Sequence, residues 1–508
     1  MIMTYASRRG FALALLAATQ FVLVLDASIV GVAMPSIGTD LNIAPDDLSW
    51  VANAYTLTFG GLLLLGGRAA DLAGRRRMFM FGMALFAAAS LAGGLATSAG
   101  MLVAARAAQG IGAALVSPAA LSLVMTVFPA GPERNRAMGV FGAVAGAGGA
   151  AGSILGGMLT QWLGWEATLW VNVPIGLAAL ALAPRLLPEA SDRTARGFDL
   201  PGALTATAGL ALLVYTLVEA GDAGWTSPRT LGLGALAVAL IGLFFLIEAR
   251  AAHPLVPLKI FRQPVLRGSN VVALLTLMAM APLFFYLTFY MQQVLGFGPV
   301  RAGMAQLPLA LAIAVTAGAA GALIARLGLR ATMAAGLAIT AAGLAWFSRM
   351  SAGGGFLTDV LGPTLVIGVG AGLAFVTTTV GATSAARPEQ AGLASGLFNT
   401  AQQVGGSLGL AAVVAISTAR TTASLAGGER VAAVALTGGY RTGMLTAAAV
   451  ALAASLLTTA LLPRRTNPTP GPVTEPPGDH LHPGPDGYRA MDDAVTPAVS
   501  TRPRASGV

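Results

Sequence analysis

An acidic side chain lies in the middle of an apolar segment near the start of the chain. The segment is FVLVLDASIVGVAMP, residues 21–35, and the acid is Asp26. An ionised carboxylate in hydrocarbon is costly, so burial favours the protonated form, and such a group can bind and release a proton near neutral pH. The chain has 21 acidic residues, and Asp26 alone lies deep within an apolar stretch. We therefore expect Asp26 to carry protons.

A second charged residue, Arg106, lies inside the apolar stretch 101–127. A charged side chain at this depth usually faces the protein interior or a wet cavity. Arg106 can pair with Asp26 in one state and release it in another, so that a proton changes the charge of a central cavity. Two other interpretations stay open. The pair can be a static salt bridge that joins two helices, or Arg106 can snorkel to the outer surface.

The composition predicts a helical protein that crosses a membrane many times. Of its 508 residues, 56% are hydrophobic and 10% are charged, whereas soluble domains have roughly 25% charged residues. The chain has no cysteine, and its three histidines lie outside the apolar stretches, so we expect no disulfide, thiol chemistry or metal site. No G-x-x-x-x-G-K-[ST] motif is present, so we expect no ATP hydrolysis and no cofactor, with a proton gradient as the energy source.

Apolar stretches of about 20 residues, the length of a membrane-spanning helix, recur between short polar connections. Fourteen spans are predicted, at 11–35, 50–69, 78–98, 101–127, 137–160, 165–187, 200–219, 230–249, 269–293, 303–325, 331–350, 358–381, 392–417 and 441–462. With both termini in the cytoplasm, most Lys and Arg residues fall in the inner loops, as the positive-inside rule requires. The net charge of +9 is therefore assigned to topology and not to nucleic-acid binding.

Two parts of the chain resemble each other. AMGVFGAVAGAGGAAG (137–152) aligns without gaps with ASGLFNTAQQVGGSLG (394–409), and GRAADLAGRR (67–76) aligns with GALIARLGLR (321–330) at a nearly equal offset. The repeat predicts an N-terminal six-helix half (1–190), two inserted helices with a linker (191–262) and a C-terminal six-helix half (263–462). Residues 463–508 are rich in Pro, Gly and Asp and are predicted to form a disordered cytoplasmic tail.

The connection GRAADLAGRRR (67–77) contains Gly67, Asp71, Gly74, Arg75 and Arg76. The glycines permit a tight turn. Asp71 can lie at the N-terminus of a helix of the other half, with the arginines bridging to it or to lipid headgroups. A plain positively charged inner loop is the other interpretation.

The stretch GAVAGAGGAAGSILGG (142–157) carries Gly148, Gly152 and Gly156 on one helix face, followed by Gly157. Small residues at every fourth position let a neighbouring helix approach closely. Close packing is thus expected whether or not the stretch has a further role.

Several motifs together resemble the major facilitator superfamily, and within it the fourteen-helix drug:proton antiporters. Besides the loop 67–77 and the stretch 142–157, they are LDASIVGVAMP (25–35), LVAARAAQGIGAA (102–114), WVNVPIG (170–176), HPLVPLKIFR (253–262), VLGFGPVRAGMAQLP (294–308) and PEQAGLASGLFNTAQQVGGSLG (388–409). The resemblance covers residues 10–462 and implies an all-α membrane protein with two parallel six-helix halves and a substrate site between them.

The resemblance also implies roles for the motifs. Asp26 and Arg106 are implied to couple transport to protons, the loop 67–77 to act as a latch on one access state, and Gly148, Gly152, Gly156 and Gly157 to form the antiporter motif. Leu72 replaces a basic residue of the loop motif, and Ser153 replaces a proline of the antiporter motif, which removes a source of a helix kink.

Neutral polar and aromatic side chains are the candidates for the substrate cavity, because the second half has no acid deep in its predicted spans. The candidates are Tyr55, Gln109, Tyr286, Tyr290, Asn399, Gln402 and Gln403. Such a surface suits lipophilic compounds that are neutral or weakly cationic. Each residue can instead make an interhelical hydrogen bond or face lipid.

The sequence therefore predicts a monomeric, multi-pass exporter in the bacterial cytoplasmic membrane, which exchanges protons for lipophilic drugs or antibiotics. One alternative is a dedicated exporter of a single secondary metabolite. Another is a membrane sensor that does not transport. An enzyme is not expected, because no nucleophile–base pair or metal cluster lies within the spans.

Overall fold

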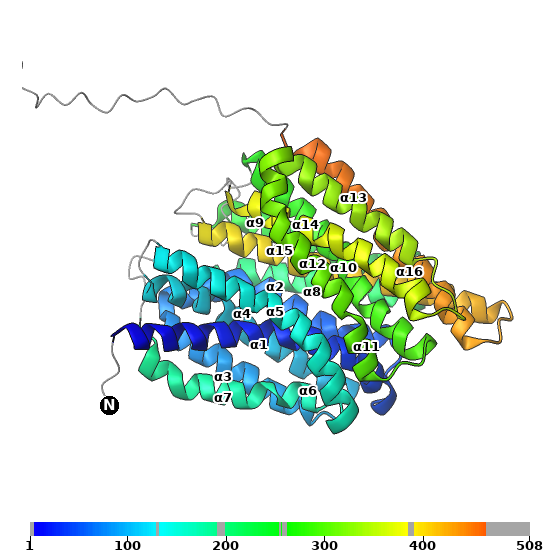
Figure 1. The fold of residues 1–508 in the computed structure, drawn as a ribbon, viewed down its shortest axis with the longest axis horizontal. Coiled ribbons are helices and arrows are strands. Elements are labelled where there is room, and N and C mark those ends of the chain that lie inside the picture. Colours follow the sequence, from blue (N-terminus) through cyan, green and yellow to red (C-terminus); the bar gives the residue numbers. More distant parts are fainter. Residues whose placement is uncertain are drawn as a thin grey trace, which may run out of the picture. The chain divides into compact units, whose positions relative to one another are not determined.

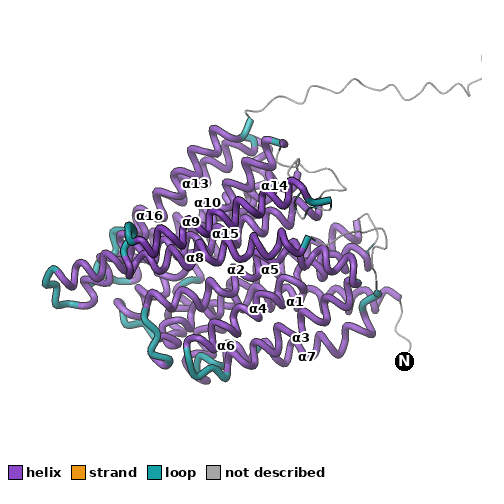
Figure 2. The backbone as a smooth tube through the Cα atoms, turned by 180° about the vertical axis from the view of Figure 1, so that it is seen from behind, coloured by secondary structure: helices purple, strands orange, loops and turns teal. Residues whose placement is uncertain are grey.

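The computed structural model describes residues 5–128, 132–189, 199–252, 254, 256, 262–384 and 391–463. The described residues form helices and connections and contain no strand (Figures 1 and 2). The predicted tail lies outside the described residues, apart from Pro463.

The helices follow the predicted spans closely. The first six spans correspond to α1 (Tyr5–Asp40), α2 (Pro45–Ala73), α3 (Arg75–Gly94), α4 (Ala99–Val127), α5 (Pro132–Leu163) and the pair α6 (Ala167–Trp170) and α7 (Asn172–Leu186). The inserted spans are α8 (Leu200–Ala223) and α9 (Pro228–Arg250). The last six are α10 (Pro264–Phe289) with the π-helical turn η2 (Tyr290–Val294), α11 (Pro299–Ala305) with α12 (Leu307–Leu327), α13 (Leu329–Phe347), the π-helical turn η3 (Phe356–Leu361) with α14 (Gly362–Ser384), α15 (Ala391–Ala426) and α16 (Ala432–Leu461).

Helix boundaries follow from local chemistry. The side chains of Ser98, Asp199 and Ser227 cap α4, α8 and α9 by accepting hydrogen bonds from backbone N–H groups of the first turn, as is usual for these residue types. The connections α2–α3 and α12–α13 each turn at a single glycine, Gly74 with φ 104° and Gly328 with φ 84°. Glycine adopts this backbone conformation without steric cost.

Twelve helical segments within the described residues are long and apolar enough to cross a membrane. Helices α2 and α5 fall outside that set, yet they contain 29 and 32 residues and pack within the same bundle. The membrane-spanning helical fold is confirmed, whereas the count of fourteen spans stays a prediction.

The two sets of six spans repeat the same helix contacts. α1 packs on α5 as α10 packs on α15, α2 and α3 pack on α4 as α12 and α13 pack on α14, and α3 packs on α7 as α13 packs on α16. The glycine pairs Gly74/Gly328 and Gly148/Gly405, aligned from the sequence, occupy corresponding places in this arrangement. The packing agrees with a duplication, while the predicted domain boundaries stay a prediction.

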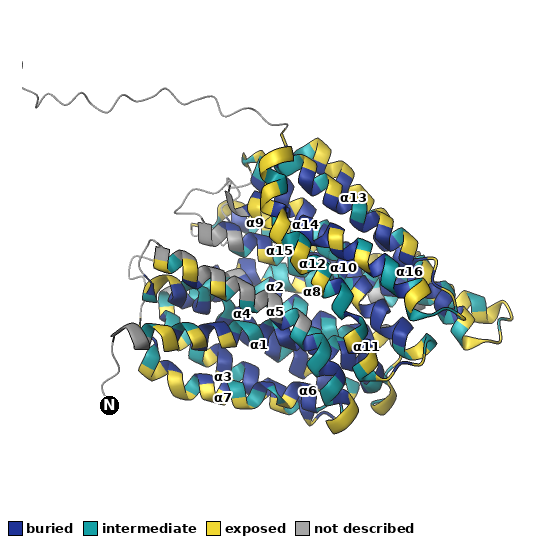
Figure 3. Ribbon diagram, in the orientation of Figure 1, coloured by how far each residue is buried: buried dark blue, intermediate teal, exposed yellow. Residues whose placement is uncertain are grey.

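The inserted helices differ in their surroundings. α8 contacts α2 and α15, one helix from each half, and Val214 of α8 packs with Leu57 and Ala411. α9 lies against α8 and exposes large apolar side chains such as Leu231 and Val238. In Figure 3 the exposed residues lie on the outward faces of the helices. Contiguous exposed apolar surface of this kind fits contact with lipid.

Candidate functional site

Asp26 and Arg106 meet in the interior of the N-terminal half. Their side chains are 0% and 1% exposed, and Arg106 Nη1 lies 2.5 Å from Asp26 Oδ2. The pair joins α1 to α4, as the sequence predicted. Both charges are removed from solvent in this state, so Arg106 does not snorkel to the surface.

The second carboxylate oxygen of Asp26 accepts two hydrogen bonds from amides. Gln109 Nε2 donates to Asp26 Oδ1 at 3.1 Å, and Asn172 Nδ2 donates to the same oxygen at 2.7 Å. Ser90 Oγ, on α3, accepts from Gln109 Nε2 at 2.6 Å. All three neutral residues are fully buried. Asp26 is thus surrounded by hydrogen-bond donors.

Ser90 and Asn172 are site residues that the sequence analysis did not single out. Asn172 lies in WVNVPIG, a stretch already noted for its resemblance, where an amide inside an apolar span is the signal that could have identified it. Ser90 gives no comparable signal, because a serine is common in membrane helices and often bonds its own helix.

Arg106 has partners besides the acid. Its Nε donates to the backbone oxygen of Val51 at 3.0 Å and its Nη1 to Gln109 Oε1 at 2.9 Å, while its guanidinium lies 4.5 Å from the centre of the Tyr55 ring. The Tyr55 hydroxyl in turn donates to the backbone oxygen of Leu23 at 3.3 Å. These neutral partners and the ring can hold the cation when Asp26 is neutralised.

Tyr55 and Gln109 were predicted to line the substrate cavity, and that role stays a prediction. They are 1% and 0% exposed, and their side chains are engaged by Arg106 and Asp26. In the described state they belong to the charged site of the N-terminal half.

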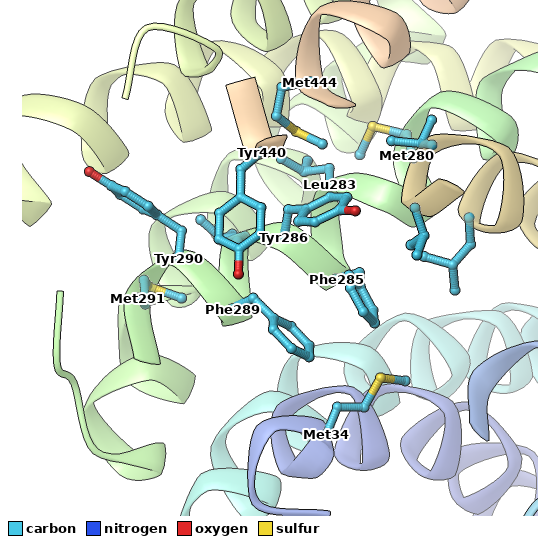
Figure 4. Close-up of a cluster of buried hydrophobic side chains, with 14 of the residues drawn as sticks. Met34, Met280, Leu283, Phe285, Tyr286, Phe289, Tyr290, Met291, Tyr440 and Met444 are labelled. Carbon is cyan, nitrogen blue, oxygen red and sulfur yellow. The ribbon is translucent and has the colours of Figure 1, made fainter. Parts of the chain in front are cut away.

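The tyrosines of α10 and η2 lie in a buried apolar cluster that reaches both halves. Figure 4 shows Tyr286 beside Tyr440, and Phe285 and Phe289 on the side facing Met34 of α1. The Tyr286 and Tyr440 ring centres are 4.9 Å apart, and those of Phe285 and Phe289 are 4.3 Å apart. Tyr286 packs on Tyr440 of α16 within the C-terminal half, and its role in the substrate cavity stays a prediction.

Tyr290 was also predicted to line the substrate cavity, and that role stays a prediction. Its hydroxyl donates to Asp359 Oδ2 at 3.0 Å and lies 2.8 Å from the backbone oxygen of Ser351. Ser351 lies in the α13–η3 connection and Asp359 lies in η3. Tyr290 is fully buried and stabilises this end of the C-terminal half.

Among the predicted residues of α15, Gln403 lies against α2. Gln402 and Gln403 are partly buried and Asn399 is exposed. The Cβ and Cγ atoms of Gln403 pack against Gly60 of α2, in the space that a side chain at Gly60 would occupy. Beside it, Thr400 Oγ1 donates to the Gly60 backbone oxygen at 3.2 Å, and the hydroxyls of Thr56 and Ser407 are 2.7 Å apart. Thr400, Gln403 and Ser407 therefore line the contact between α2 and α15, which we call the seam.

The glycines of α5 contact two different neighbours. A side chain on Gly148, Gly152 or Gly156 would meet residues 21–29 of α1, the turns that carry Asp26. A side chain on Gly157 would instead meet Pro299 and Val300 of α11. The predicted close packing is present, and it connects the acid's helix to the interface between the halves.

The basic loop contacts its own half. Arg76 Nε lies 3.3 Å from Glu189 Oε2, and Arg76 Nη1 donates to the backbone oxygen of Leu187 at 3.2 Å. Arg75 Nη1 donates to Thr126 Oγ1 at 2.8 Å. The predicted bridge from the arginines to Asp71 is not tested, because the Asp71 side chain lies outside the described residues. A Cβ on Gly67 would meet Pro118 of α4 at an ordinary distance of 3.6 Å.

We expect Arg76→Ala to lower the free energy of unfolding by roughly 1 kcal/mol, because a partly buried ion pair and a bond to a carbonyl are lost. Thermal unfolding in detergent measures this. Arg77→Ala is the matched control, since Arg77 is 75% exposed and lies 3.8 Å from Glu189. Equal effects of the two substitutions would contradict the prediction.

Comparison with known protein families matches residues 16–410 to the Major Facilitator Superfamily. The chain is 42% identical to the cephamycin export protein CmcT of Amycolatopsis lactamdurans, over 81% of this chain and 86% of that protein. It is 41% identical to the puromycin resistance protein of Streptomyces alboniger, over 90% and 92%. It is 38% identical to the tetracenomycin C resistance and export protein of Streptomyces glaucescens, over 78% and 73%.

Solved structures with a similar fold include the peptide transporter PepTSo, with a TM-score of 0.66, 16% identity and coverage of 90% of this chain and 97% of that one. A bacterial homologue of the human lysosomal transporter Spinster, solved in an inward-facing conformation, has a TM-score of 0.63 and 16% identity over 89% and 97%. At these identities the likeness concerns the fold.

Proposed function

The chain belongs to the major facilitator superfamily, and from this premise we propose that it exports lipophilic antibiotics across the bacterial cytoplasmic membrane in exchange for protons. Members of this superfamily are transporters, so the chain is a multi-pass membrane transporter and not an enzyme. The names of its relatives, which denote antibiotic export and resistance, support the direction and the substrate class.

The observation that carries proton coupling is the buried acid. Asp26 is fully buried, is bonded to Arg106, and is held by neutral donors on its other oxygen. A proton that binds Asp26 removes the negative partner of Arg106, while the carbonyl of Val51, Gln109 and the Tyr55 ring keep the cation in place. Protonation thus changes the charge of the site without expelling the arginine, and the ion pair acts as a switch.

α1 links this site to the closure between the halves. The residues around Asp26 pack on the glycines of α5. Six positions further along α1, the backbone oxygen of Val32 accepts a hydrogen bond from Gln292 Nε2 of η2 at 3.0 Å. We call the end of the bundle that carries the α1–α2 connection the outer end, following the predicted topology. A shift of α1 on proton binding would act directly on this outer contact.

The apolar cluster at the interface supports a lipophilic substrate. Phe285, Phe289 and Met34 lie where the two halves meet (Figure 4). Aromatic rings and methionine adapt to apolar ligands of different shapes. The polar seam of Gln402, Gln403 and Ser407 lies on α15, and we assign it the hydrogen bonds that orient the compound.

Export is tested in inside-out vesicles that have an acidic interior. Puromycin, tetracenomycin C, cephamycin and the lipophilic cation ethidium are added in turn, and proton release and compound uptake are recorded against vesicles without the protein. Release and uptake together support antiport. Uptake that persists without a proton gradient contradicts the proposal. The absence of both proton release and uptake with every compound also contradicts it.

The same panel separates two substrate ranges. Three relatives are named after one antibiotic each, which favours a dedicated exporter as the second candidate. Release with a single scaffold assigns the chain to dedicated export, and release with several scaffolds assigns it to multidrug efflux.

The topology and the monomeric state are part of the same proposal. Because the chain has no cysteine, single cysteines introduced near each terminus can be labelled from either side of the membrane. We expect labelling from the cytoplasmic side only, and the mass of one chain in the purified transporter.

We expect Gln292→Leu to weaken the contact between the halves at the outer end, because the hydrogen bond from Gln292 to the Val32 backbone oxygen is lost. We call this contact the outer closure. A net hydrogen bond contributes about 0.5–1.5 kcal/mol, so the population open to the outside should rise by up to about tenfold. The labelling rate of a cysteine at the buried Met34 measures this. Gln293→Leu is the matched control, because Gln293 accepts from Tyr440 within its own half. A faster rate in the control variant only would refute the assignment.

A further inference from the structure

Asn172 lies in the sixth span, where α6 and α7 adjoin. α6 ends at Trp170 and α7 begins at Asn172, so the amide lies in the first turn of α7. Its side chain is 0% exposed. Its Nδ2 donates to Asp26 Oδ1 at 2.7 Å and lies 3.4 Å from Ser90 Oγ.

The other amide atom of Asn172 is unused. Asn172 Oδ1 is buried and accepts no hydrogen bond in the part of the chain that the structure describes. Buried polar atoms almost always have a partner, so an exception next to an acid needs an explanation. The oxygen would gain a partner if a new donor formed beside it.

Protonation of Asp26 creates such a donor. A carboxylate only accepts hydrogen bonds, whereas a carboxylic acid donates one. The other groups at Asp26 are poor acceptors for this proton. Arg106 has donors only, and Gln109 Oε1 already accepts from Arg106. Among the residues whose side chains bond Asp26 in the described part of the chain, Asn172 therefore offers the acceptor that has no hydrogen bond, its Oδ1.

We propose that Asn172 is a positioning residue that serves both protonation states of Asp26 by rotating its side-chain amide. With the carboxylate, Nδ2 donates to Asp26 Oδ1. When that oxygen takes a proton from the aqueous phase, the amide turns about its Cβ–Cγ bond and Asn172 Oδ1 accepts the new O–H. Release of the proton reverses the rotation, and no covalent bond of Asn172 is made or broken. This inference rests on the proposed proton coupling.

The surroundings of Asp26 leave this role to Asn172. Among the described residues, the charged and titratable groups at Asp26 are Arg106 from α4 and Tyr55 from α2. α3 presents Ser90, and α5 presents glycines. The amide thus adjusts hydrogen bonds without adding a competing charge.

The pH profile of proton release tests the proposal. The probe is the compound from the panel above that gives the largest release, and the protein is the full chain in inside-out vesicles. Asn172→Leu keeps the branched arrangement of the side-chain heavy atoms but removes both donor and acceptor. Because the charge-assisted bond to the carboxylate is the stronger of the two, we expect the midpoint of the profile to move to higher pH by about one unit, a tenfold change in proton affinity.

Asn270→Leu is the matched control. Asn270 is also a buried asparagine in a span with an unpartnered Oδ1, but its Nδ2 donates to the backbone oxygen of Leu266. We expect its midpoint to be unchanged. A lower maximal rate of Asn172→Leu at an unchanged midpoint would show a merely structural role and overturn the proposal.

If Asn172→Leu does not fold, a variant that exchanges the positions of the acid and the amide tests the proposal instead. The double variant Asp26→Asn with Asn172→Asp keeps one acid and one amide in contact. We expect it to regain at least a tenth of the proton release that Asp26→Asn alone loses, and no recovery would overturn the proposal. If the unaltered chain releases no protons with any compound, the proposed function itself fails, which is a separate outcome.

Discussion

Asp26→Asn should abolish compound-driven proton release, leaving less than about 1% of the original rate, the scale of loss expected when a group essential to proton transfer is removed. The substituted amide has nearly the same shape as the acid but does not take up a proton in this pH range. Binding of the exported compound should persist, because the described contacts of Asp26 are all to the residues of the charged site.

The change also leaves Arg106 without its anionic partner. Removing one member of a buried ion pair is often destabilising by roughly 3–5 kcal/mol. Here the carbonyl of Val51, Gln109 and the Tyr55 ring still hold the guanidinium, so we expect the smaller end of that range. Thermal unfolding in detergent, recorded beside transport, separates lost coupling from lost protein.

Asp40→Asn is the matched control for this substitution. Asp40 lies on the same helix as Asp26 but is exposed at its end, so its substitution should leave proton release within twofold, as for surface changes generally. If Asp26→Asn released protons as fast as the unaltered chain, Asp26 would be a structural acid. The static salt bridge, or a membrane sensor without transport, would then be the better interpretation.

The sequence was sufficient for the charged pair because its signal is strong. A carboxylate and a guanidinium inside two apolar stretches have few stable arrangements other than contact with each other, and the structure places them in contact. The glycines of α5 were equally predictable, because a spacing of four residues identifies one helix face without further information.

The remaining site residues depend on tertiary packing. Tyr55 and Gln109 are polar residues of apolar helices, and their sequence does not tell whether they face a cavity or a neighbouring charge. Asn172 reaches Asp26 across the packing of α7 on α1, 146 positions away in the chain. The Tyr290 hydroxyl donates a hydrogen bond to Asp359, a residue 69 positions away in the chain. Contacts of this kind join distant segments, and periodicity within one segment cannot reveal them.

Among the α5 glycines that face α1, Gly152 should be the one whose substitution by alanine is most damaging. Its Cβ would lie 2.6 Å from the Cβ of Ser28 and 2.9 Å from the backbone oxygen of Leu25. Both atoms belong to α1, one on each side of Asp26, and a backbone oxygen cannot turn away as the end of a side chain can. We expect the free energy of unfolding to fall by about 1–3 kcal/mol, the range for overpacked cores.

Gly149→Ala distinguishes this clash from any general effect of alanine in the helix. At Gly149 the nearest atom to an added Cβ is Ser28 Oγ at 3.7 Å, an ordinary contact. Alanine also favours the helix over glycine by roughly 0.5–1 kcal/mol, so this variant should be at least as stable as the original.

Thermal unfolding and proton release are measured on both variants. Because Gly152 sets the distance between α5 and the helix of the acid, its substitution should reduce release as well as stability. Equal behaviour of the two variants would mean that α1 can move away from α5 at little cost, and the proposed transmission from Asp26 to the outer closure through α1 would then lose its support.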